Sequence, residues 1–146
     1  MEIIVFSETR SVIEAFSGLS RKGKCDVSFM KIGELRKGLG GLAPDSLVYL
    51  DISRMDDVAL RKALRMLSGN NGLRYAVIDP KNAIRDAGAL FHGGACDYVC
   101  RETLRDGLTE KRVRRAAGFR KSDAPETGPE GAGSRTTYKP SGRDWK

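Results

Sequence analysis

Residues 47–51 read Leu-Val-Tyr-Leu-Asp, which is four apolar side chains followed by a carboxylate. A short, continuous apolar run of this kind is typical of a strand buried on both faces of a parallel sheet. The same pattern occurs at residues 3–6, at 75–78 and, more briefly, at 98–100. Residues 27–32 alternate apolar and polar side chains, as an edge strand does. The sequence therefore predicts five strands.

Between these strands, apolar side chains return at the spacing of one helical face. Asp56 and Asp57 are placed to cap one of these segments, and glycines follow several of them as they follow helix ends. Strand and helix alternate five times, which favours an α/β domain whose parallel sheet is covered by helices on both faces. The expected helices cover residues 12–22, 34–42, 58–68, 84–92 and 104–118.

The composition is that of a soluble globular chain, with 40% hydrophobic and 31% charged residues among 146. Glu2 follows Met1, and the apolar runs are far too short to cross a bilayer, so we expect a cytoplasmic protein without a membrane partner. One histidine and three cysteines do not suggest a zinc site. From Ser122 onward, proline and glycine stand among polar residues, which is typical of a linker. We expect a domain over residues 1–120 and a flexible linker over 121–146 that leads to an output domain.

The net charge of +7 is uneven along the chain. Residues 101–121 hold eight Lys or Arg against three Asp or Glu. A basic helix can bind nucleic acid, but no aromatic residues interleave with these charges and no helix-turn-helix signature accompanies them. The pattern therefore favours a solvated helix face over a nucleic-acid interface.

The carboxyl ends of the strands are where chemistry gathers in parallel α/β sheets. The residues at those positions are Ser7 and Glu8, Asp51, Asp79 and Arg101. Residues 7–10 lack the glycine-rich patterns of nucleotide-binding loops, and no Ser-His or Cys-His pair is well placed. We therefore expect no catalysis within this chain and no cofactor.

The segment 47–53, LVYLDIS, and the segment 94–101, GACDYVCR, together resemble response-regulator receiver domains over about residues 1–120. The resemblance implies a flavodoxin-like three-layer sandwich with a five-stranded parallel sheet in the order 2-1-3-4-5. It also implies that Asp51 occupies the phosphoacceptor position and that Tyr98 stands where the family often has a rotating aromatic. Arg101 stands at the position of the family's lysine, and Glu102 replaces the proline that usually follows.

The sequence departs from the family at the residues that support phosphorylation. The family holds Mg²⁺ with two carboxylates after the first strand together with the acceptor, whereas Ser7-Glu8 supplies one, so Glu8 and Asp51 would be weak ligands. Asp79 replaces a hydroxyl that bonds to the phosphoryl group, and an ionised carboxylate would repel that group. We expect Arg101 to form an ion pair with Asp51, Asp79 or both, since these carboxylates would otherwise lack a cation.

These departures favour a non-enzymatic pseudo-receiver that signals through contacts with another signalling domain or with itself as a homodimer. Its expected working face includes Tyr98, Arg112 and Arg115. The alternative is a true receiver of a two-component system, phosphorylated on Asp51 with Mg²⁺. Purely structural roles for these residues also stay open. Asp51 could cap a turn, Asp79 before Pro80 could begin one, and Tyr98 could be a packing residue with its hydroxyl at the surface. The ending TYKPSGRDWK resembles sequences that precede class III nucleotide cyclase domains.

Overall fold

The computed structural model describes residues 2–21, 25–43, 45–69 and 73–118. Its centre is one five-stranded sheet in which all neighbouring strands are parallel and the order is β2-β1-β3-β4-β5. This confirms the predicted fold class and strand order. The strands are β1 (Glu2–Phe6), β2 (Asp26–Met30), β3 (Leu47–Asp51), β4 (Arg74–Asp79) and β5 (Tyr98–Cys100).

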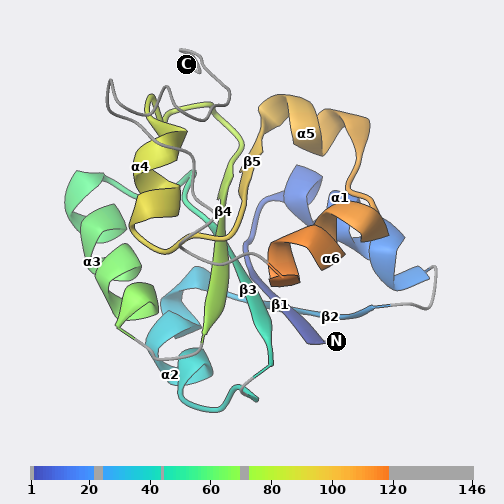
Figure 1. The fold of residues 1–146 in the computed structure, drawn as a ribbon, viewed down its shortest axis with the longest axis horizontal. Coiled ribbons are helices and arrows are strands. Elements are labelled where there is room, and N and C mark those ends of the chain that lie inside the picture. Colours follow the sequence, from blue (N-terminus) through green and yellow to red (C-terminus); the bar gives the residue numbers. More distant parts are fainter. Residues whose placement is uncertain (1, 22–24, 44, 70–72, 119–146) are drawn as a thin grey trace.

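Helices cover both faces of the sheet, so the molecule has three layers (Figure 1). On one face lie α1 (Arg10–Arg21), α5 (Arg101–Asp106) and α6 (Glu110–Gly118). On the other face lie the 3₁₀ turn η1 (Ile32–Glu34) and the helices α2 (Leu35–Leu39), α3 (Asp57–Ser68) and α4 (Ala87–His92). This is the flavodoxin-like arrangement that the sequence predicts.

Each face of the sheet has its own apolar core, because successive strand side chains point to opposite faces. Under α1 and α6, the ring of Phe16 meets the ring of Tyr49 edge to face, with 4.7 Å between centroids. Under α2 and α3, Phe6, Leu50 and Leu67 are completely buried. Beyond their first residues, the central strands β1, β3 and β4 are buried, whereas β2 is an edge strand whose Phe29 is 37% exposed.

The start of α4 lies later than predicted. Ile84 precedes the helix instead of belonging to it, and Asp86 is the N-cap, with its Oδ1 accepting from the Ala89 N–H at 3.2 Å. The backbone N–H groups of Ala83 and Ile84 bind the carboxylate of Asp79, at 2.9 and 2.8 Å. These bonds hold the segment before α4 against the end of β4.

The last predicted helix is two helices, not one. Gly107 separates α5 from α6 with φ +93° and ψ 151°, a conformation that residues with a Cβ rarely adopt. Thr109, the residue before α6, then caps the helix, since its Oγ1 accepts from the Arg112 N–H at 3.1 Å. The apolar spacing runs through the break because Leu104, Leu108 and Val113 all pack against the same core.

No helix in the described part of the chain is long and apolar enough to cross a membrane. The predicted linker over 121–146, with the ending that resembles a lead-in to a cyclase, lies outside the described residues.

Candidate functional site

Two buried carboxylates end neighbouring strands of the sheet. In the β3–β4 register Asp51 pairs with Ile78, so Asp79 lies one residue further along the adjacent strand. Both aspartates are 0% exposed, and Ser7, the first residue after β1, is 4% exposed. The structure thus places Ser7, Asp51 and Asp79 at the same carboxyl edge, where a parallel α/β sheet carries its chemistry.

Neutral donors surround the carboxylate of Asp51. Its Oδ2 accepts from the hydroxyls of Ser7 at 2.7 Å and Thr9 at 2.6 Å. Its Oδ1 accepts from the backbone N–H of Ser53 at 2.9 Å. The Thr9 and Ser53 hydroxyls are themselves 3.4 Å apart. Hydroxyls and one amide therefore compensate the burial of this anion.

Asp79 also accepts three hydrogen bonds, but from different groups. The backbone N–H groups of Ala83 and Ile84 donate to its two oxygens, and the Tyr98 hydroxyl donates to Oδ2 at 2.6 Å. Burial, and then the bond to Asp79, raises the pKa of Tyr98 above its usual range, so the phenol stays a proton donor. The Tyr98 hydroxyl is thus bonded within the site and not free at the surface.

The predicted ion pair of Arg101 with Asp51 or Asp79 does not form in the structure. The Arg101 side chain is 67% exposed, and its Nε lies 3.6 Å from a carboxylate oxygen of Glu102. The reason is local: β5 runs directly into α5, so that Arg101 is the first residue of a helix. Each of the two buried aspartates accepts three hydrogen bonds from neutral donors.

Asn82 ties the loop after β4 to the start of α5. Its Oδ1 accepts from the Arg101 N–H at 2.9 Å, and its Nδ2 donates to Glu102 at 2.9 and 3.3 Å. This bond is the main reason that the pKa of Glu102 is lowered. Asn82 has φ +51°, a left-handed conformation that asparagine tolerates better than most residues.

Sequence reasoning missed Thr9, Ser53 and Asn82. Two of them carry a recognisable signal, because Ser53 follows Asp51 by two residues, the spacing at which an aspartate side chain bonds to the backbone. Thr9 likewise follows Ser7 by two residues, and its N–H donates to the Ser7 hydroxyl at 3.1 Å. Asn82 bridges segments 20 residues apart and has no comparable local signal.

The predicted Mg²⁺ pair of Glu8 and Asp51 receives no support from the geometry. Glu8 is exposed, and the groups that contact the Asp51 carboxylate are hydroxyls and an amide. Within the described ranges, no three or more His, Cys, Asp or Glu side chains are grouped so as to hold a metal ion. The residues around Asp51 therefore do not fit the carboxylate-rich coordination that the receiver resemblance implies.

The three residues of the expected working face have different surroundings. Arg115 is exposed, whereas Tyr98 is bonded to Asp79. Arg112 is not the free surface cation that the sequence suggests: its Nε and one terminal nitrogen each lie 2.9 Å from Asp97, and that nitrogen also donates to the Tyr98 carbonyl at 2.8 Å. This bidentate pair fastens α6 to the entrance of β5.

No protein-family model matches the chain, and a search of curated proteins gives no match. What the structure shows of the expected relationship is the receiver-like, flavodoxin-like fold.

Proposed function

We propose that this chain is a receiver-like regulatory module that acts through protein contacts and does not depend on phosphorylation of Asp51. The observation that supports this most directly is the bonding of the two strand-end aspartates. Each is fully buried, and each is bonded to at least three neutral donors of the chain itself.

Phosphorylation of Asp51 would need a carboxylate oxygen free to attack and cations to offset the charge of the phosphoryl group. Both oxygens of Asp51 accept hydrogen bonds, Oδ2 from two hydroxyls and Oδ1 from the Ser53 N–H, so attack by either oxygen competes with bonds inside the chain. The guanidinium of Arg101 lies near Glu102. The phosphoryl group would be a third negative group beside Asp51 and Asp79. Because both aspartates are buried, the repulsion between these groups would be poorly screened by water.

At the position where the receiver family has a hydroxyl that bonds to the phosphoryl group, Asp79 supplies a carboxylate that accepts hydrogen bonds without phosphorylation. It holds Tyr98 and the loop before α4 together. A module built in this way keeps one conformation at this edge of the sheet and acts as a scaffold for another signalling domain or for a second copy.

The test is amide NMR of the full chain with Mg²⁺ and beryllium fluoride, a mimic of the phosphoryl group. We expect no resonance changes that cluster at residues 7–9 and 51–53. Clustered changes that disappear in Asp51→Asn would instead support the phosphoacceptor alternative and overturn the proposal.

Protein contacts require a separate measurement. Light scattering over a range of concentrations reports self-association, and Arg115→Glu changes one exposed cation of the expected face. A concentration-dependent dimer that this variant weakens would support homodimerisation. A monomer at all concentrations would exclude homodimerisation, and the proposed contact would then be with a different signalling domain.

A further inference from the structure

The basic run at the end of the described chain is largely neutralised by its own carboxylates. Arg112 is paired with Asp97, and Arg114 with Glu110 at 2.7 Å. On α5, Arg101 and Arg105 lie near the carboxylates that follow them in the sequence. Four of the six cations that the structure describes in this segment are therefore paired, and Lys111 and Arg115 have no ion pair among the described residues.

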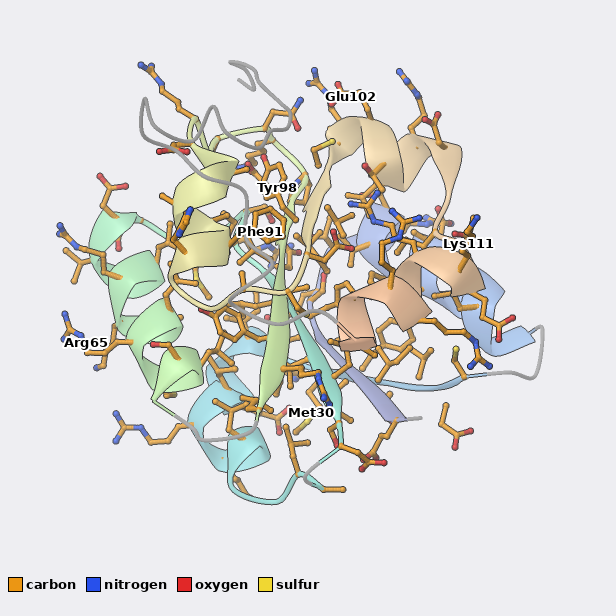
Figure 2. All side chains as sticks on the ribbon, in the orientation of Figure 1. Met30, Arg65, Phe91, Tyr98, Glu102 and Lys111 are labelled. Carbon is orange, nitrogen blue, oxygen red and sulfur yellow. The ribbon has the colours of Figure 1, made fainter. Side chains whose placement is uncertain are left out.

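A different helix carries cations without partners. The outward side of α3 presents Val58, Arg61, Lys62 and Arg65, which we call the α3 stripe. These residues follow the i, i+3, i+4, i+7 spacing of one helical face, and all are exposed. Among the described residues, the three cations of the stripe have no ion pair or side-chain hydrogen bond. Figure 2 shows Arg65 pointing away from the sheet.

The stripe also holds an unusual apolar residue. Val58 is 67% exposed and is one of two large hydrophobic residues that are exposed in the described part of the chain. The opposite side of α3 packs inward through Leu60, Ala63, Leu64 and Leu67, so Val58 is not needed for the core. On the same face of the sheet, α2 adds the exposed Arg36 and Lys37.

We infer that the α3 stripe is a docking surface for an acidic segment of another protein, one that sets carboxylates against the three cations and an apolar side chain against Val58. Arginine binds carboxylates in a bidentate way, and a small apolar contact surrounded by charge pairs is a common composition of protein interfaces. This inference does not depend on whether Asp51 is phosphorylated.

Other occupants fit the stripe less well. A second copy of the chain carries a net charge of +7 and would bring like charges together. A nucleic acid is bound by cations that follow the backbone and by aromatic rings that stack on bases, whereas Val58 to Arg65 spans only about 10 Å along one helix and holds no aromatic residue. A membrane surface would favour more than one exposed apolar residue beside the cations.

The test uses the full chain and a fluorescein-labelled peptide of 12 residues that contains glutamates and two leucines, followed by fluorescence anisotropy. We expect binding that weakens as salt rises. The triple variant Arg61→Glu, Lys62→Glu, Arg65→Glu should weaken it at least about tenfold, since like charges then face each other. Val58→Ser should weaken it by a smaller factor, and a peptide with serine in place of leucine should no longer respond to Val58→Ser.

A matched control separates the stripe from net charge. Arg105→Glu, Lys111→Glu, Arg114→Glu makes the same change of charge on α5 and α6, on the other face of the sheet, and should leave peptide affinity within about twofold. Circular dichroism confirms that both triple variants fold. Equal losses in the two triple variants, or no binding of the peptide by the native chain, would overturn the inference. So would tighter binding of duplex DNA or phosphatidylserine vesicles through the same cations.

Discussion

At the scale of single residues, Asp51 and Asp79 are both buried carboxylates, but their hydrogen-bond donors differ. A buried carboxylate is costly unless its oxygens accept hydrogen bonds. Asp51 takes two of its three donors from side-chain hydroxyls, which rotate freely to suit other partners. Asp79 takes two of its three from the backbone, which also fixes the loop that it caps. Of the two sites, the one at Asp79 is therefore the more rigid.

The bond between Tyr98 and Asp79 should contribute measurably to stability. Tyr98→Phe removes one donor to a charged acceptor, and we expect the free energy of unfolding to fall by about 1–2 kcal/mol. Asp79→Ala should cost more, because it also leaves the N–H groups of Ala83 and Ile84 without an acceptor. Urea denaturation of both single variants and the double variant measures the coupling. Strictly additive losses would show that the hydroxyl and the carboxylate do not interact.

Tyr49 presents the opposite case, a buried polar atom without a partner. Its ring is 0% exposed in the core under α1 and α6, and its hydroxyl is the one buried side-chain polar atom without a hydrogen bond in the described residues. Burial raises the pKa of Tyr49 above its usual range. Tyr49→Phe removes only that hydroxyl, so we expect unfolding free energy to be unchanged or higher by up to about 2 kcal/mol.

Tyr75 is the matched control for Tyr49, because its hydroxyl donates to the Gly93 carbonyl at 3.2 Å. Tyr75→Phe should lower the free energy of unfolding by about 1 kcal/mol. Denaturation of the two variants side by side tests the difference. A loss of stability in Tyr49→Phe as large as that in Tyr75→Phe would mean that the Tyr49 hydroxyl has a partner in solution.

At the scale of elements, α6 is attached to the rest of the domain by Arg112 more than by the other cations of that helix. Arg112 is 33% exposed and its partner Asp97 is 14% exposed, whereas Arg114 pairs along the surface of its own helix. Arg112→Ala leaves the poorly solvated Asp97 without its cation, and we expect a loss of about 2 kcal/mol. Arg114→Ala should cost less than about 0.5 kcal/mol. Similar losses in thermal or urea unfolding for the two variants would contradict this assignment.

The elements that were predicted from the sequence are those whose pattern depends on burial alone. The runs at residues 3–6, 47–50 and 75–78 became central strands because both faces of the sheet are covered. The break at Gly107 was missed because apolar spacing continues through it, and the late start of α4 because Ile84 packs against the core although it precedes the helix. The position of Asp79 at the sheet edge could be predicted, but not its donors.

Arg101 shows why side-chain partners are harder to predict than positions. The argument from charge balance paired it with Asp51 or Asp79, on the premise that buried carboxylates need a cation. The structure satisfies both with hydroxyls, a phenol and backbone N–H groups, so the premise was wrong. An interaction between residues of three different elements depends on side-chain directions that no local pattern specifies.

At the scale of the whole molecule, one cysteine and three tyrosines that can lose a proton in alkaline solution are buried or partly buried in the two cores. Burial, and then the nearby Asp97, raise the pKa of the Cys96 thiol to about 12. The pKa values of Tyr49, Tyr75 and Tyr98 are also raised, in each case chiefly by burial. The folded chain therefore retains protons that the unfolded chain releases in alkaline solution.

The sign of the resulting pH dependence follows from linkage. For a group whose pKa is higher in the folded state, the stabilisation is fully present below the unfolded pKa and is lost as pH rises toward the folded pKa. For Cys96 that window runs from its ordinary value of 9.0 to about 12. We expect the free energy of unfolding to be nearly constant up to about pH 8 and then to fall, at a limiting slope of about 1.4 kcal/mol per pH unit for each group. Urea titrations at pH 7, 9 and 10 measure the slope, and Cys96→Ala should reduce it between pH 9 and 10, because Cys96 is then absent from both states. A slope that Cys96→Ala leaves unchanged would show that the thiol titrates alike in the folded and unfolded chain.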